Sequence, residues 1–297
     1  MKPLRAAQRL RLGAILLLRH LPLRWVSAIG AWLGERNARD AIAARRLWVD
    51  RLHRNFQQLG GLDDPRQRER AIVAHRRALG TAHVEFTVLQ RLVAAGRVEV
   101  QGVEQLEALA QPVIIAGAHL ANWELLGHVL ERLGRPAAGI IAPPDDVVER
   151  TVAARARRGW NVDLALFPAD SPLAARRVVE ALHAGRNLLL FVDEEAQGYI
   201  RAPRLGREVP LLGNLSIAAR LAARHGCPIV PAHVVALGRA RYRIVVEPPL
   251  DAGEGGFAQR AEHLAEQLDA TLSRWVRADL EHWYWLAQYE QQRQPPR

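Results

Sequence analysis

The sequence has few of the residues on which several classes of protein depend. A single cysteine, Cys227, excludes an intramolecular disulfide framework and a cysteine-based zinc site. No G-x-S-x-G motif occurs, so the usual sequence sign of a serine nucleophile is missing. The N-terminal apolar stretch, Gly13 to Leu18, is far shorter than the ~20 residues of a spanning helix, and no clear cleavage site marks a signal peptide. Linkers, repeats and low-complexity stretches are absent apart from a polar tail, which favours one globular unit.

The positive charge of the chain is concentrated near its N-terminus. Residues 1–60 contain twelve Lys and Arg against three Asp and Glu, so this part carries +9 of the net +10. Apolar residues recur there at helical spacing, at Leu18, Leu21, Trp25, Ile29 and Trp32. Such a helix suits the surface of an anionic bilayer, with arginines at the headgroups and tryptophans at the interface. Packing of this helix on the protein's own core is the alternative, and a tilted or re-entrant insertion stays open.

From residue 98 onward the hydrophobic pattern predicts alternating strands and helices. Six stretches have the pattern of strands, at residues 98–102, 112–119, 137–144, 187–193, 228–235 and 241–249, and the first of them alternates apolar and polar residues. Helical patterns occupy residues 123–134, 147–159, 172–185, 214–226 and 257–280. This alternation predicts an α/β fold with a mostly parallel central sheet that helices cover on both faces.

Residues 38–95 have no strand pattern and are expected to be helical. Gly60 and Gly61 mark the end of one helix, and Asp64 with Pro65 marks the start of the next as N-cap and first helical residue. We therefore expect a basic amphipathic, membrane-associating segment (1–37), a single domain (38–290) and a flexible tail (291–297).

The stretch HLANWE, residues 119–124, carries the clearest sign of chemistry. His119 ends an apolar run, and ligand sites in open α/β sheets form at such carboxyl ends of strands. Asn122 is expected to cap the next helix, which places Glu124 in the first turn and within reach of His119. A carboxylate on Nδ1 would leave Nε2 free to take a proton. Without a nucleophile of its own, this couple suggests activation of a substrate hydroxyl and direct acyl transfer between two bound substrates.

Taken alone, His119 and Glu124 also fit an ordinary strand-to-helix turn, because a first-turn glutamate stabilises the helix dipole without any catalysis. HLANWE resembles, however, the H-x4-[DE] box of glycerolipid acyltransferases. GAHLANWE resembles its form in the bacterial lipid A biosynthesis late acyltransferases, the HtrB-like lauroyl/myristoyl acyltransferase family. Further stretches follow in the order of that family, among them ARARRGWNV, VVEALHAGRNLLLFVDEEAQG, LGNLSIAARLAARHG, RYRIVVEPPL and LEHWYWLAQYE. The resemblance covers roughly residues 10–290.

The resemblance implies a membrane acyltransferase of lipid A and lipopolysaccharide biosynthesis. It would move a fatty acyl chain from acyl carrier protein or coenzyme A to a lipid hydroxyl. It would act at the cytoplasmic face of the bacterial inner membrane, as a peripheral or monotopic protein. His119 is then the general base and Glu124 the carboxylate that orients it. No metal, no other cofactor and no nucleic-acid partner is implied.

The resemblance also implies a set of substrate-binding positions. They are Asn122, Trp123, Arg155, Arg157, Asp193 and Glu195. The first two would shape the turn, one of the arginines would contact an anionic substrate or the oxyanion, and the acidic pair would help to position the catalytic pocket. A solvated helix face for the arginines and a strand-end turn for the acidic residues are the alternatives.

Some positions depart from the family pattern. Ala121 stands where the family usually has glycine, VDEE replaces an Asp-Gln pair, and the chain lacks the basic-aromatic C-terminus. The acceptor therefore stays open among a lipid A precursor, a lysophospholipid, a glycolipid and an aminolipid. A hydrolase using the same couple on water and a non-catalytic lipid-binding protein of the same fold are alternatives of other classes. The basic charge alone suggests nucleic acid, but no docking motif for it occurs.

Overall fold

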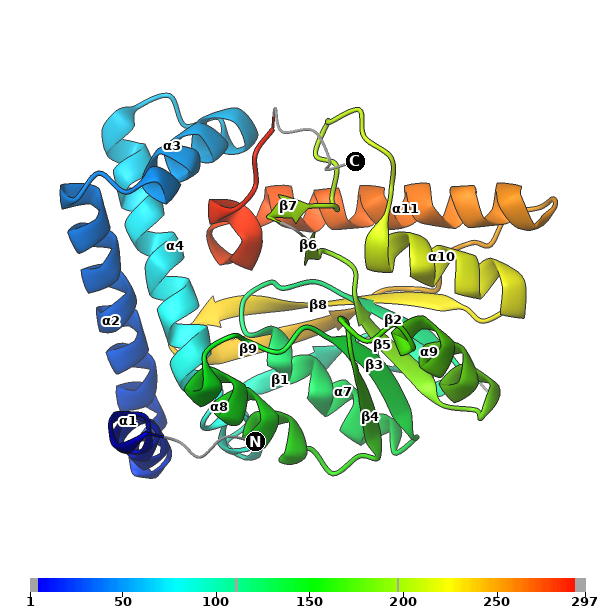
Figure 1. Cartoon of the computed structure of the whole chain (residues 1–297), viewed down its shortest axis with the longest axis horizontal. Helices are drawn as coiled ribbons and strands as arrows, with labels where there is room; N and C mark the ends of the chain where they lie inside the picture. The colour runs from blue at the N-terminus through cyan, green and yellow to red at the C-terminus, as the bar shows by residue number, and fades with distance from the viewer. Residues whose placement is uncertain (1–4, 110–111, 197, 292–297) are drawn as a thin grey trace.

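The computed structural model describes residues 5–109, 112–196 and 198–291. Its centre is a seven-stranded sheet of order β1-β9-β8-β2-β5-β3-β4 (Figure 1). The strands of this sheet are β1 (Val98–Gln101), β2 (Ile114–Gly117), β3 (Ala137–Ile141), β4 (Leu164–Pro168), β5 (Asn187–Phe191), β8 (Ile229–Gly238) and β9 (Arg241–Val246). A separate antiparallel pair is formed by β6 (Glu195–Ala196) and β7 (Tyr199–Ile200).

The sheet is mostly parallel, as the sequence pattern predicts. β8, β2, β5, β3 and β4 share one direction, whereas β9 runs antiparallel to β8 and carries β1 parallel to itself. All six expected strands are present. The pattern missed β4, because this five-residue edge strand follows a polar loop and none of its residues is fully buried.

Helices cover both faces of the sheet. The α-helices are α1 (Ala6–Leu17), α2 (Leu23–Ala43), α3 (Leu47–Gly60), α4 (Pro65–Glu85), α5 (Leu89–Ala94), α6 (Glu104–Glu107), α7 (Leu126–Leu133), α8 (Val147–Arg158), α9 (Ala174–His183), α10 (Gly213–His225) and α11 (Phe257–Ala278). The 3₁₀ turns are η1 (Leu18–His20), η2 (Trp123–Leu125), η3 (Leu280–His282) and η4 (Tyr284–Ala287). Ile114 of β2 belongs to a core shared with α9, α10 and α11, whereas Ile115 belongs to a core shared with α5, α7 and α8. Successive side chains of β2 thus point to opposite faces of the sheet and pack into two different cores.

The N-terminal segment is two helices rather than the one helix that the spacing of its apolar residues suggested. α1 ends at Leu17, and Leu21 is extended (φ −76°, ψ 157°) before Pro22, the conformation that residues before proline prefer. α2 begins after Pro22 and continues through the boundary expected at residue 37. Within the described parts of the chain, no helix has the length and apolar character needed to cross a bilayer.

α2 packs closely along α4, and the two helices stand together beside the sheet (Figure 1). A Cβ on Gly30 or Gly34 would overlap the backbone of α4, so only glycine permits this approach. α4 begins as expected, because the Asp64 side chain accepts a hydrogen bond from the Arg66 amide (3.0 Å) and Pro65 is the first helical residue. Gly61, at φ 64°, ends α3 as expected.

Candidate active site

His119 and Asp193 meet at the carboxyl ends of two neighbouring strands. β2 and β5 are parallel, and Gly117 is the register partner of Phe191, so each residue lies two positions beyond a paired strand end. The His119 Nδ1 atom is 2.9 Å from Asp193 Oδ1, and the His119 backbone N–H donates to Asp193 Oδ2 at 2.8 Å. Asp193 is fully buried, while the His119 side chain remains 20% exposed. The pair thus combines a desolvated carboxylate with an imidazole that solvent can reach.

The hydrogen bonds around Asp193 define the tautomer of His119. Asp193 Oδ2 also accepts from the indole N–H of Trp283 at 3.0 Å, so the carboxylate receives N–H donors at both oxygens. We therefore place the proton of His119 on Nδ1, donating to Asp193, although the Trp285 Nε1 atom lies 3.3 Å from the same nitrogen. Nε2 has no hydrogen bond to any residue in the described ranges, and it is the nitrogen available to a substrate.

Aromatic rings enclose the His119 imidazole. The ring centroid of Phe191 lies 4.5 Å away, that of Trp123 5.4 Å and that of Trp285 5.5 Å. Trp285 comes from the C-terminal segment, which pairs with the His119 turn: the amide of Tyr284 donates to the His119 carbonyl at 2.9 Å. These apolar walls limit water around the histidine and strengthen its interaction with Asp193.

Among the described residues, Glu124 forms no hydrogen bond with His119, whereas the sequence suggested one. Its carboxylate is held instead by Arg157 of α8, whose Nε lies 3.1 and 3.0 Å from its two oxygens and whose Nη2 also donates to Oε1. The reason is local geometry: residues 123–125 form the 3₁₀ turn η2, which takes Glu124 toward α8 while Asp193 occupies Nδ1. The predicted orienting contact is thus made by Asp193. Glu124 instead forms an ion pair with Arg157, one of the two candidate arginines.

Asn122 and Ala121 form the bend between His119 and Glu124. Asn122 is fully buried and does not cap the following turn as expected, because its side-chain amide donates to Glu85 of α4 (3.1 Å). Ala121 has a positive φ of 49°. This is the left-handed region, so a glycine at this position would be free of the strain that a Cβ causes.

Comparison with known proteins identifies the chain. A sequence model of the family described as bacterial lipid A biosynthesis acyltransferase matches residues 2–289. The chain belongs to this family. Among solved structures, the crystal structure of the 1-acyl-sn-glycerophosphate (LPA) acyltransferase PlsC from Thermotoga maritima is similar, with 14% identity and a TM-score of 0.40 over 86% of this chain and 99% of that one. No protein with a curated description matches the chain.

In this acyltransferase, Arg157 also lines a pocket of about 360 Å³ beside α8. Its apolar wall comes from the last residue of β3, the loop before β4 and the first half of β4, with Ile141, Val162, Leu164 and Leu166. Arg150 and Arg158 add positive charge to its rim. The pocket therefore offers a hydrocarbon surface beside guanidinium groups.

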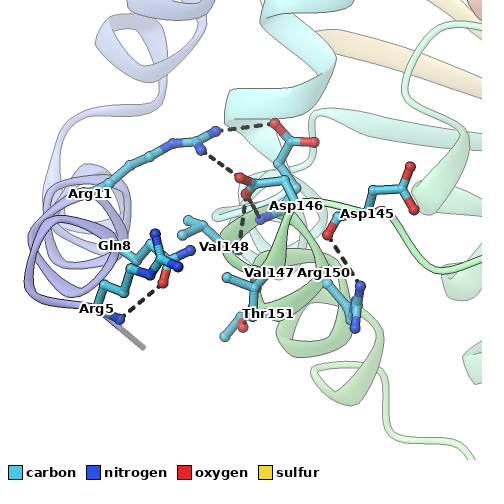
Figure 2. A network of polar contacts seen from close by, with 10 residues as sticks. Arg5, Gln8, Arg11, Asp145, Asp146, Val147, Val148, Arg150 and Thr151 are labelled. Carbon is cyan, nitrogen blue, oxygen red and sulfur yellow. Dashed lines mark hydrogen bonds and ion pairs between the residues drawn. The ribbon is translucent and has the colours of Figure 1, made fainter. Parts of the chain in front are cut away.

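The start of α8 is fixed by a capping residue that also binds α1. Asp146 accepts from the amides of Val148 (2.9 Å) and Glu149 (3.0 Å), which satisfies the first turn of the helix. Figure 2 shows Arg11 of α1 reaching Asp146, where Nη1 and Oδ2 are 3.0 Å apart. The N-terminal helix of the acyltransferase thus touches the helix that carries Arg157.

Two predicted site residues of the acyltransferase lie apart from this cluster. Arg155 is exposed on α8 and does not line the pocket. Glu195 belongs to the β6–β7 pair, where its carboxylate accepts from the Gly198 amide. No group of three His, Cys, Asp or Glu side chains in the described part of the chain is arranged to hold a metal ion.

No role for the C-terminal tryptophans of the acyltransferase follows from the sequence beyond a match in the motif LEHWYWLAQYE. Trp283 is fully buried and binds Asp193, and Trp285 packs on His119. Asn55 of α3 anchors this segment by donating to the carbonyls of Leu286 (2.7 Å) and Tyr289 (2.8 Å). The sequence shows two tryptophans close together in this segment, but nothing in it places them beside residues 119 and 193.

Proposed function

We propose that this acyltransferase moves a fatty acyl chain from an acyl thioester of acyl carrier protein or coenzyme A to a hydroxyl of a lipid A precursor or a related bacterial lipid. The observation that carries the proposal is His119, bound to the buried carboxylate of Asp193 and exposing Nε2 at the carboxyl edge of the sheet. This arrangement suits a general base that acts on a substrate rather than on an enzyme nucleophile.

The chemical step begins with the acceptor hydroxyl at Nε2 of His119. The imidazole takes the proton as the hydroxyl oxygen attacks the thioester carbonyl carbon, and Asp193 stabilises the imidazolium that forms. The tetrahedral intermediate then collapses, its C–S bond breaks, and the imidazolium returns the proton to the leaving thiolate. The products are the acylated lipid and the free thiol of the donor.

Arg157 is the group that we assign to the acyl donor. Its Nε and Nη2 are used by Glu124, whereas Nη1 has no hydrogen-bond partner among the described residues. Glu124 thereby orients the guanidinium at the boundary between the histidine turn and the apolar pocket. A guanidinium there would bind a phosphate of the donor or the oxyanion, while the pocket wall takes apolar chain.

We assign membrane attachment to the outward face of α2. Trp25 and Trp32 are each 56% exposed and Leu33 is 46% exposed, whereas the opposite face of the helix is buried against α4. Arg24 and Arg36 flank these side chains on the same helix. An apolar face rimmed by arginines favours the headgroup region of an anionic membrane, here the cytoplasmic face of the inner membrane.

The test is transfer of a labelled acyl group from acyl carrier protein or coenzyme A to bacterial lipid extract. His119→Ala should slow transfer by about 10²–10⁴-fold, the usual contribution of a general base. His183→Ala is the matched control, because His183 is exposed at the end of α9 and should leave the rate unchanged. Equal rates for wild type and His119→Ala would refute the proposed mechanism. Free fatty acid as the main product would indicate a hydrolase, and lipid binding without turnover a non-catalytic protein.

A further inference from the structure

A buried carboxyl group lies behind the histidine turn. Glu85, the last residue of α4, is fully buried, and three side chains from three other parts of the chain bind it. Its Oε2 atom accepts from the amide of Asn122 (3.1 Å) and from the hydroxyl of Tyr242 in β9 (2.5 Å). Its Oε1 atom lies 2.5 Å from the hydroxyl of Ser27 in α2. Glu85 thus joins α2, α4, β9 and the turn in one network.

Asn122 is the member of this network that lies in the site. It follows the strained Ala121 and stands between His119 and Glu124, the two residues whose side chains reach Asp193 and Arg157. Its Oδ1 atom is buried without a hydrogen-bond partner among the described residues, so the side chain is held through its NH₂ group, which donates to Glu85 and also interacts with the Tyr242 hydroxyl. A buried polar group with few hydrogen bonds depends on them for its position.

The other side of the network depends on the close packing of α2 and α4. Gly30 and Gly80 face each other, and a Cβ on either would overlap the backbone of the other helix. This approach brings the short side chain of Ser27 within reach of Glu85. The same serine lies 3.1 Å from the carbonyl of Leu23, so its hydroxyl can accept a hydrogen bond from Glu85 and donate one to Leu23.

The hydrogen bonds are complete when Glu85 is neutral. Burial raises the pKa of the Glu85 carboxyl group, against the opposing effect of the three hydrogen bonds. A proton on Oε1 then donates to Ser27, Ser27 donates to Leu23, and Oε2 accepts from both Asn122 and Tyr242. A glutamine can make the same set of bonds, with its nitrogen toward Ser27 and its oxygen toward Asn122.

We propose that Glu85 is a positioning residue of the acyltransferase: by binding Asn122 it holds the turn that presents His119 and Glu124. The inference rests on the proposed function, since its readout is acyl transfer. Glu85 acts on the reaction only through Asn122 and not by binding substrate.

The test compares variants that keep or remove the hydrogen bonds of Glu85. Glu85→Gln should transfer acyl groups with a kcat within threefold of wild type, because glutamine reproduces the bonds of the neutral acid. Glu85→Leu should lower kcat at least tenfold and change the KM for the thioester donor by less than threefold. Both are measured on folded protein, as judged by circular dichroism. Glu85→Gln as slow as Glu85→Leu, or Glu85→Leu with the wild-type kcat, would overturn the proposal.

A second pair of variants decides the question if Glu85→Leu does not fold. Asn122→Ala and Tyr242→Phe each remove one hydrogen bond from the same oxygen of Glu85, but only Asn122 lies in the turn. Asn122→Ala should lower kcat at least tenfold, whereas Tyr242→Phe should stay within threefold of wild type. Equal kcat values for these two variants would contradict the inference. If wild type and His119→Ala transfer acyl groups at the same rate, the proposed function is refuted whatever the Glu85 variants do. If His119→Ala is slower than wild type, the proposed function stands, and the Glu85 and Asn122 variants test this inference alone.

Discussion

Replacing Asp193 by asparagine tests the central contact of the site. Three N–H groups face this carboxylate: Nδ1 of His119 at Oδ1, and the His119 amide and the Trp283 indole at Oδ2. An asparagine has one acceptor oxygen, which will take the position with two donors, so its NH₂ group faces Nδ1. The histidine must then carry its proton on Nε2, where the acceptor hydroxyl would bind.

The size of the effect follows from these contacts. A hydrogen bond to a charged group contributes about 1.5–3 kcal/mol, so loss of the carboxylate charge lowers kcat by about 10–10²-fold. The wrong tautomer adds to this, and the same exchange in a Ser-His-Asp triad costs about 10⁴-fold. We therefore expect Asp193→Asn to lower the kcat of acyl transfer by about 10²–10⁴-fold.

The assay is single-turnover transfer from a labelled thioester, with thermal unfolding as a check on folding. Asp193→Asn added to His119→Ala should cause no further loss, because residues that act as a unit are not additive. Glu124→Gln is the matched comparison, since Glu124 binds Arg157 and should still slow the reaction when His119 is already alanine. An Asp193→Asn rate within threefold of wild type would refute the reasoning and restore Glu124 as the partner.

Three further predictions concern packing, pH and membrane binding. Gly34→Ala should lower the free energy of unfolding, measured in urea, by about 1–3 kcal/mol, because its Cβ would overlap the Arg76 carbonyl. Gly13→Ala is the control because there is open space around Gly13, and an equal loss of stability in the two variants would contradict the close packing. Burial lowers the pKa of His75 from 6.5 to about 3, so the folded state resists its protonation and stability falls as the pH drops from 6.5 toward 3. His75→Phe should reduce this slope by up to about 1.4 kcal/mol per pH unit, and an unchanged slope would exclude His75 as its source. Trp32→Ala should weaken binding to anionic vesicles by about 1 kcal/mol, roughly fivefold, and unchanged binding would remove α2 from the membrane contact.

The sheet could be predicted from the sequence because six of its seven strands carry a strand pattern. This pattern is a mostly apolar run in β2, β3, β5 and β8 and an alternation of apolar and polar residues in β1 and β9. The N-terminal segment was harder. Its large apolar residues, such as Trp25 and Trp32, lie on the outward face of α2, whereas the face packed on α4 is built from Gly30, Gly34 and Ala38. Glycine and alanine contribute little to a hydrophobic pattern. The pattern in the sequence therefore shows the exposed face of α2 and not the face that packs on α4.

Only part of the candidate site could be predicted from the sequence. His119 could be found because it ends a strand and lies in a recognisable stretch, and Asp193 was assigned to the pocket only by resemblance. Their contact spans 74 residues and exists because β5 is inserted between β2 and β3 instead of following β4 at the edge. Glu124 was predicted as the partner because it lies only five residues from His119 in the sequence, and a sequence gives no distances in space. In a parallel sheet, the partner of a histidine two residues beyond a strand is better sought at the same offset on the strand that pairs with it, and here the Gly117–Phe191 register leads directly to Asp193.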